Sequence, residues 1–128
     1  MINELIEKAF EARENAYAPY SKFKVGAALL TANGKIYTGC NVENASYPVG
    51  ICAERVAMSK AVAEGERKFV VIAIVGDGSS YCYPCGMCRQ FISEFCSEDF
   101  EIISVKSADD YKIIKMGELL PYTFNLFK

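Results

Sequence analysis

Two short segments of the chain place cysteines where a thiolate is favoured. Residues 52–55 read Cys-Ala-Glu-Arg, and residues 84–88 read Pro-Cys-Gly-Met-Cys. Each segment follows a loop-like stretch and precedes a helical pattern, so we expect each to open a helix. Unpaired N–H groups and the helix dipole place partial positive charge at that end, which lowers the pKa of a thiol. The sequence therefore indicates metal or thiol chemistry at two helix starts.

The spacing of these residues favours a zinc site with one open position. The chain contains no histidine, so thiolates and carboxylates are the metal ligands that it offers. Cys85 and Cys88 lie on one side of a helical turn, whereas Cys52 and Glu54 would point to opposite sides of a regular helix. We infer that the metal lies beyond the helix start, near its axis. Three thiolates at about 2.3 Å leave the fourth tetrahedral position of Zn²⁺ for water, as in a catalytic site.

The two cysteine segments also match a known signature. A lone Cys-x-x-Cys is shared by redox motifs and zinc ribbons, but Cys-Ala-Glu followed about thirty residues later by Pro-Cys-x-x-Cys is typical of zinc-dependent deaminases. Together with residues 19–28 (PYSKFKVGAA), 41–47 (NVENASY) and 118–121 (ELLP), the chain resembles the small homotetrameric cytidine deaminases over most of its length.

The resemblance implies a fold, an activity and a cofactor. The fold is α/β, a three-layer α-β-α cytidine deaminase-like fold with a mixed, mostly five-stranded sheet, in one domain over residues 1–128. The activity is hydrolytic deamination of cytidine and deoxycytidine to uridine and deoxyuridine with release of ammonia, a step of pyrimidine salvage. The resemblance further implies that Cys52, Cys85 and Cys88 hold one Zn²⁺ per chain and that Glu54 is the catalytic proton carrier. Three thiolates and Zn²⁺ carry a net charge of −1, and we expect Arg55 to compensate it.

Further matches imply contacts with the substrate and with a second subunit. Phe23 matches an aromatic beside the base, and the backbone of Ala53 matches a base contact. Asn41 and Glu43 match groups that hold the ribose 3′-hydroxyl. The positions that match residues reaching into a neighbouring subunit's site are Ala45, Tyr47 and Phe124. The resemblance therefore implies a homotetramer with shared active sites. The sequence departs from the family pattern at Tyr83, where Ser is frequent, at the extra thiol of Cys82 and in a tail that stops at Lys128.

Other interpretations of the cysteines stay open. Cys82 can complete a structural Cys₄ zinc module with no enzymatic activity. Cysteines at 82, 85 and 88 also resemble part of an iron–sulfur motif, but Ile92 stands where the pattern of bacterial ferredoxins needs a further cysteine. Within the deaminases, the alternative is an enzyme for another aminopyrimidine nucleoside such as blasticidin S. Asn41 and Glu43 favour an ordinary nucleoside.

The composition of the chain limits the kinds of partner that it can bind. The net charge is −2 without a cluster of Lys or Arg, so the chain has no electrostatic footprint for nucleic acid. Hydrophobic residues make up 52%, which is rich enough that we expect subunit contacts to cover apolar surface. Glu4, Glu7 and Lys8 exclude a signal peptide or a membrane span at the start of the chain. We expect a small nucleoside substrate, no membrane partner and a cytoplasmic location, where six cysteines would not form disulfides.

The elements that position these residues follow from apolar periodicity. The pattern predicts the order α-β-β-α-β-α-β-β-α, which favours one mixed sheet with helices on its faces. Helices are expected over residues 2–10, over 52–64, from Pro84 to about 96 and briefly before Pro121. Strands are expected over residues 25–30, 35–42, 69–75, 100–106 and 111–116, the first two joined by an Asn33-Gly34 turn.

Overall fold

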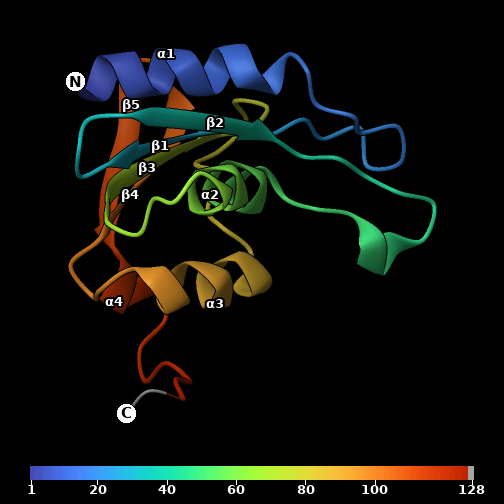
Figure 1. Cartoon of the computed structure of the whole chain (residues 1–128). Helices are drawn as coiled ribbons and strands as arrows, with labels where there is room; N and C mark the ends of the chain where they lie inside the picture. Colours follow the sequence, from blue (N-terminus) through green and yellow to red (C-terminus); the bar gives the residue numbers. More distant parts are fainter. Residues whose placement is uncertain (127–128) are drawn as a thin grey trace.

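A five-stranded sheet lies between helices on both of its faces (Figure 1). The computed structural model describes residues 1–126. Neighbouring strands follow the order β2-β1-β3-β4-β5, and only the β3–β4 pair of these strands is parallel, so the sheet is mixed. The strands are β1 Gly26–Thr31, β2 Ile36–Cys40, β3 Phe69–Val75, β4 Glu101–Ser107 and β5 Asp110–Lys115.

The helices complete three layers, and this confirms the predicted fold class. Helix α1 (Ile2–Arg13) covers one face of the sheet, where it buries Leu5, Ile6 and Ala9. Helices α2 (Ala53–Ala63) and α3 (Gly86–Phe95) cover the other face, and the short α4 (Met116–Leu119) follows β5. Within residues 1–126, none of the helices combines the length and the apolar character that a bilayer crossing requires. The assignment of residues 1–128 to one domain stays a prediction.

Two glycines let the helices approach the sheet closely. A Cβ on Gly26 of β1 would lie 2.0 Å from the carbonyl oxygen of Ala9 in α1. A Cβ on Gly39 of β2 would lie 2.5 Å from the carbonyl oxygen of Ala53 and 2.6 Å from the backbone nitrogen of Ala57. Real side chains do not tolerate such distances, so both glycines are needed for the packing. The second contact fixes the first turn of α2, where the predicted metal motif begins.

The chain between β2 and α2 differs from the sequence expectation. The strand predicted over residues 35–42 ends at Cys40, and Val42 instead forms isolated bridges with Tyr17 and Ile51. A short 3₁₀ helix, Tyr47–Val49, follows, with Pro48 in its first turn. This segment projects from the body of the molecule at the right of Figure 1. At the start of the segment, the side chains of Asn41 and Glu43 bond the loop that precedes β1.

Candidate active site

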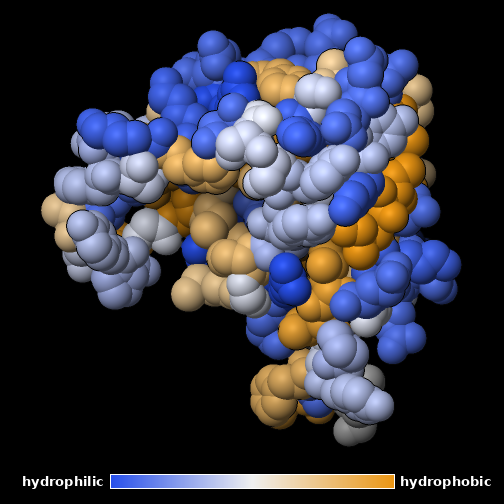
Figure 2. Space-filling view, turned by 180° about the vertical axis from the view of Figure 1, so that it is seen from behind, coloured by the Kyte–Doolittle hydropathy of each residue, from blue (hydrophilic) through white to orange (hydrophobic). Residues whose placement is uncertain are grey.

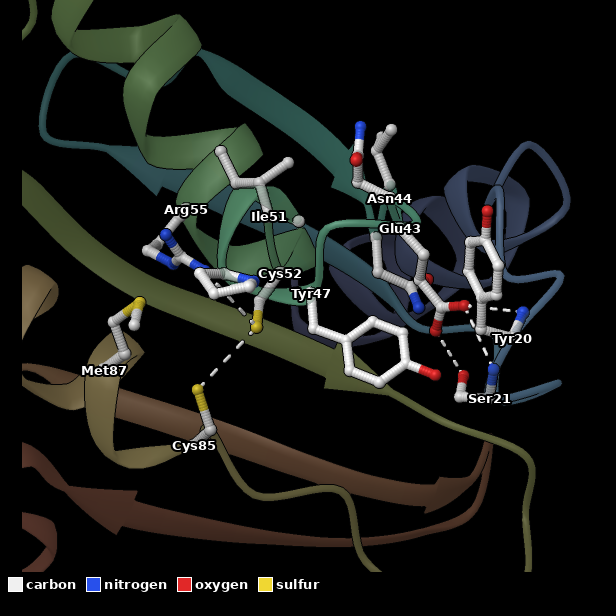
Figure 3. A pocket seen from close by; sticks show the side chains of 14 residues that line it. Tyr20, Ser21, Glu43, Asn44, Tyr47, Ile51, Cys52, Arg55, Cys85 and Met87 are labelled. Atoms are coloured by element: carbon white, nitrogen blue, oxygen red, sulfur yellow. Dashed lines mark hydrogen bonds between the residues drawn. The ribbon is translucent and has the colours of Figure 1, made fainter.

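The starts of α2 and α3 bring three thiols together. Cys52 is the N-cap residue of α2, Cys85 is the N-cap residue of α3, and Cys88 lies in the first turn of α3. The sulfur atoms all lie within 4.8 Å of one another, and the Sγ atoms of Cys52 and Cys85 are 3.7 Å apart (Figure 3). Sulfurs bonded tetrahedrally to zinc at about 2.3 Å are separated by about 3.8 Å. The donor set therefore fits a zinc ion with three thiolate ligands.

The thiols of Cys52 and Cys85 are available to bind a metal because they do not cap their own helices. Neither Cys52 nor Cys85 makes a side-chain cap hydrogen bond, and both have an extended backbone. A hydrogen bond with Cys88 lowers the pKa of Cys52 to about 5, and Arg55 and Cys85 act in the same direction. The same hydrogen bond raises the pKa of Cys88. The opposite shifts follow from the close approach of the two thiols, which two ligands of one cation also require.

Arg55 lies beside the sulfur of Cys52, whose negative charge it is predicted to compensate. Its Nη2 donates to the Sγ of Cys52 at 3.8 Å. Its Nε is buried without a hydrogen-bond partner among the described residues. The guanidinium is therefore placed to withdraw negative charge from a thiolate, which supports the predicted compensating role.

Glu54 is held inside the protein, next to the thiols. It lies in the first turn of α2, and only 4% of its surface is exposed. Burial raises the pKa of Glu54 to about 7, and the charge of Cys52 acts in the same direction, whereas hydrogen bonds with its own backbone and Cys88 oppose the shift. A carboxyl group that titrates near neutral pH can both accept and release a proton.

A cavity of about 500 Å³ opens beside Cys52 and Cys85. The projecting segment between β2 and α2 forms one wall, and the surface is hollowed between that segment and the body (Figure 2). This volume lies in the range that small-molecule sites occupy. Side chains that line it include Tyr20, Asn41, Glu43, Tyr47, Cys52 and Cys85, several of which Figure 3 labels. Glu54 does not line this cavity in the described chain.

Asn41 lies at the cavity, but its amide already holds a loop. Its Oδ1 accepts from the backbone N–H of Val25 at 2.9 Å, and its Nδ2 donates to the carbonyl oxygen of Phe23 at 2.9 Å. These two bonds fix the chain that leads into β1. The predicted contact of Asn41 with the ribose stays a prediction.

Glu43 is bonded in a similar way. Its Oε1 accepts from the backbone N–H groups of Tyr20 and Ser21 at 3.0 and 3.1 Å, and its Oε2 accepts from the Ser21 hydroxyl. The bonds with Ser21 lower the pKa of Glu43. Sequence reasoning missed Tyr20 and Ser21 as parts of the site. Both stand in the segment that carries the resemblance, but no local pattern shows which carboxylate they bond.

The remaining predicted substrate residues are scattered. The Phe23 ring lies beside Gly76: a Cβ added to that glycine would be 2.8 Å from the Cζ of Phe23. Ala53 is fully buried, and its carbonyl oxygen faces Gly39 of β2. Tyr47 is 76% exposed and packs edge-on against Tyr20, with ring centroids 6.0 Å apart.

Ala45 and Phe124 do not line the cavity of their own chain. Ala45 is exposed in the projecting segment. Phe124 is 70% exposed in the C-terminal tail, where its carbonyl oxygen accepts from Nε2 of Gln90 at 3.3 Å. Their predicted roles in a neighbouring subunit's site remain untested within one chain.

Cys82 lies outside the thiol cluster of the described residues, which consists of the cysteines at 52, 85 and 88. Its Sγ would lie 3.3 Å from a Cβ on Gly76, close to the Phe23 ring. Burial raises the pKa of Cys82 to about 12, so it is a neutral thiol. This placement does not favour the Cys₄ module or the iron–sulfur alternative, because both need Cys82 as a ligand.

Comparison with known proteins agrees with this site. A family model described as "Cytidine and deoxycytidylate deaminase zinc-binding region" matches residues 1–104. A cytidine deaminase of Sporosarcina psychrophila is 45% identical over 97% of this chain and 91% of its own length. One of Halalkalibacterium halodurans is 48% identical, with 94% and 91% covered. The crystal structure of the cytidine deaminase from Burkholderia pseudomallei superposes with a TM-score of 0.90 at 49% identity, over 94% of this chain and 97% of that one.

The fold and the three-thiol site thus place this chain in the class of zinc-binding deaminases that act on the base of a nucleoside or nucleotide. This chain belongs to the cytidine and deoxycytidylate deaminase family.

Proposed function

We propose that this protein is a zinc-dependent cytidine deaminase, which converts cytidine and deoxycytidine to uridine and deoxyuridine and releases ammonia. The observation that carries the proposal is the meeting of three thiols and a buried Glu54 beside a cavity of nucleoside size. Identity of 45–48% with cytidine deaminases over most of the chain supports this choice of substrate. The enzyme is a hydrolase, since water supplies the oxygen that replaces the amino group.

The mechanism assigns separate tasks to neighbouring residues. Cys52, Cys85 and Cys88 would hold the metal; when bound, zinc polarises a water molecule and makes it nucleophilic near neutral pH. The reaction forms a C4–O bond, breaks the bond between C4 and the amino nitrogen, and releases that nitrogen as ammonia. Glu54 would carry a proton to N3 of the pyrimidine and a later one to the departing amine. Arg55 would partly neutralise the negative charge on the thiolate sulfurs.

The sugar contacts are compatible with the hydrogen bonds that Asn41 and Glu43 already make. A carboxylate offers about four lone-pair sites, and Glu43 uses three of them on Tyr20 and Ser21. The amide of Asn41 retains one N–H and one lone pair beyond its bonds to the loop. We therefore infer that both residues can bond a ribose hydroxyl without releasing the loop.

The proposal extends to assembly and location. Exposed aromatic side chains at Tyr47 and Phe124 support a homotetramer in which each chain completes a neighbour's site. All six cysteines are free, which supports a reducing cytoplasmic location. We expect neither nucleic acid nor a membrane as a partner.

A substrate panel tests the proposal. Ammonia release is measured with cytidine, deoxycytidine, 3′-deoxycytidine and blasticidin S. Cytidine and deoxycytidine should be turned over, and 3′-deoxycytidine more slowly, because it lacks the hydroxyl that Glu43 is proposed to bind. Glu43→Gln should shrink the preference for cytidine over 3′-deoxycytidine, whereas Glu118→Gln, the same change at a carboxylate that does not line the cavity, should keep it. Turnover of blasticidin S alone would contradict the assignment.

A further inference from the structure

One arginine joins the metal loop to the C-terminal part of the chain. Arg89 follows Cys88 directly in α3. Its Nε donates to the carbonyl oxygen of Pro84 at 2.8 Å, and its Nη1 donates to the carbonyl oxygen of Leu119 at 2.9 Å. Pro84 immediately precedes Cys85, and Leu119 ends α4. A single guanidinium therefore connects two segments that lie about thirty-five residues apart in the sequence.

The carbonyl of Pro84 needs a partner of this kind. Pro84 is buried, and it stands before the N-cap residue of α3, so its carbonyl lies outside the helix ladder. The first helical acceptor is the carbonyl of Cys85, which takes the backbone N–H of Arg89 at 2.9 Å. Arg89 thus bonds the carbonyl on each side of Cys85: its side chain bonds that of Pro84, and its backbone N–H bonds that of Cys85 itself.

The tail is attached to the same turn of α3. Gln90, the next residue, donates through Nε2 to the carbonyl oxygen of Phe124 at 3.3 Å. Within the described tail, Tyr122 is fully exposed and Leu126 is largely exposed, so few side-chain contacts hold this stretch in place. The polar contacts from Arg89 and Gln90 are therefore important for the direction that the tail takes.

We propose that Arg89 is a positioning residue that holds the Cys85 loop in its zinc-binding conformation and sets the course of the C-terminal tail. This inference rests on the proposed function, because it assumes that Cys85 is a zinc ligand. Arginine suits the task, since its planar fork can reach two carbonyls at once, whereas the single ammonium of lysine cannot reproduce that geometry.

The first test compares zinc release from zinc-loaded protein to a chromogenic chelator. Arg89→Lys should release zinc at least about tenfold faster than wild type. Ile92→Val is the matched control, because it trims a fully buried side chain of the same helix without touching either carbonyl. It should lower the melting temperature but leave the release rate near that of wild type. Equal release from Arg89→Lys and wild type, or equally fast release from Ile92→Val, would overturn the proposal.

A spectroscopic test separates loop geometry from general stability. Cobalt(II) bound in place of zinc gives visible thiolate-to-metal bands that depend on the arrangement of the sulfurs. Arg89→Lys should change these bands, and Ile92→Val and Gln90→Ala should not. Unchanged bands in Arg89→Lys would mean that this residue does not shape the site. These readouts involve no turnover, so a protein that binds zinc but fails to deaminate cytidine would refute the proposed function and still decide the role of Arg89.

The tail is followed with a fluorophore in a chain that has no tryptophan of its own. In a Phe124→Trp background, Arg89→Lys should lower the fluorescence anisotropy of the introduced indole, because the tail loses its anchor at Leu119. Gln90→Ala should also lower the anisotropy but leave zinc release unchanged. Unaltered anisotropy in the Arg89→Lys protein would show that the tail does not depend on this residue.

Discussion

Cys52, Cys85 and Cys88 converge because each stands at or near the first residue of a helix whose start faces the same point. The sequence predicted that these three thiols lie at helix starts and face one site, and the structure groups them. It also predicted Arg55 beside Cys52. The bonds of Glu43 to Tyr20 and Ser21 could not be predicted, because they join residues more than twenty positions apart through loop conformations that have no periodic signal.

Glu54 is the residue whose loss should affect catalysis most directly. Glu54→Gln keeps the shape and hydrogen-bonding capacity of the side chain, but an amide cannot carry protons between water and the base. We expect kcat to fall by about 10²-fold or more, with zinc content and fold retained. The measurement is cytidine turnover per bound zinc. Glu118→Gln, in the short helix after β5, serves as the control and should stay active; full activity of Glu54→Gln would disprove the mechanism.

Cys82 distinguishes the catalytic site from a structural zinc module. Cys82→Ser should retain both zinc and activity, because the structure groups only the other three thiols of this region and a fourth thiolate would occupy the position that water needs. Metal content and turnover are measured on the same preparation, with Cys88→Ser as the control that should lose zinc. Loss of metal from Cys82→Ser would support the Cys₄ module.

The secondary structure was predictable where local patterns are strong. The continuous apolar run of β3 and the Ala-rich stretch of α2 gave the correct elements, and α2 stops just before Gly65, whose φ is 96°. The early end of β2 and the 3₁₀ helix, Tyr47–Val49, were not predicted. Both depend on bridges from Val42 to Tyr17 and Ile51, which are tertiary contacts.

The packing of α2 on β2 is the contact between elements that positions Cys52 and Glu54. Gly39→Ala would place a Cβ 2.5 Å from the carbonyl oxygen of Ala53, so the helix start must shift. We expect a loss of about 1–3 kcal/mol in the free energy of unfolding, the usual cost of overpacking. Denaturant unfolding of the zinc-loaded protein measures it. Gly86→Ala is the control, since its Cβ would meet nothing within 4 Å; equal stability of the two variants would show that β2 does not fix α2.

In the whole assembly, we expect each active site to be shared between chains. The test is co-expression of Glu54→Ala with Phe124→Ala, followed by purification of mixed assemblies. If Glu54 and Phe124 of one site come from different chains, random equal mixing restores about a quarter of the sites. The residual activity of Phe124→Ala is subtracted, because loss of one stacking aromatic costs only about 1 kcal/mol. If the activity of the mixed assemblies is no greater than the mean of the two single variants, the shared site is refuted. Either both residues of a site then come from the same chain, or Phe124 lies outside the site.

We infer that one zinc ion per chain, held by Cys52, Cys85 and Cys88, gives this protein its cytidine deaminase activity. The most direct measurement removes the metal with a chelator, returns zinc in steps, and follows the ultraviolet change as cytidine becomes uridine. We expect no turnover without metal and a linear rise in turnover that stops at one zinc per chain. Turnover that is independent of zinc, or a fully zinc-loaded protein that leaves cytidine unchanged, would contradict it.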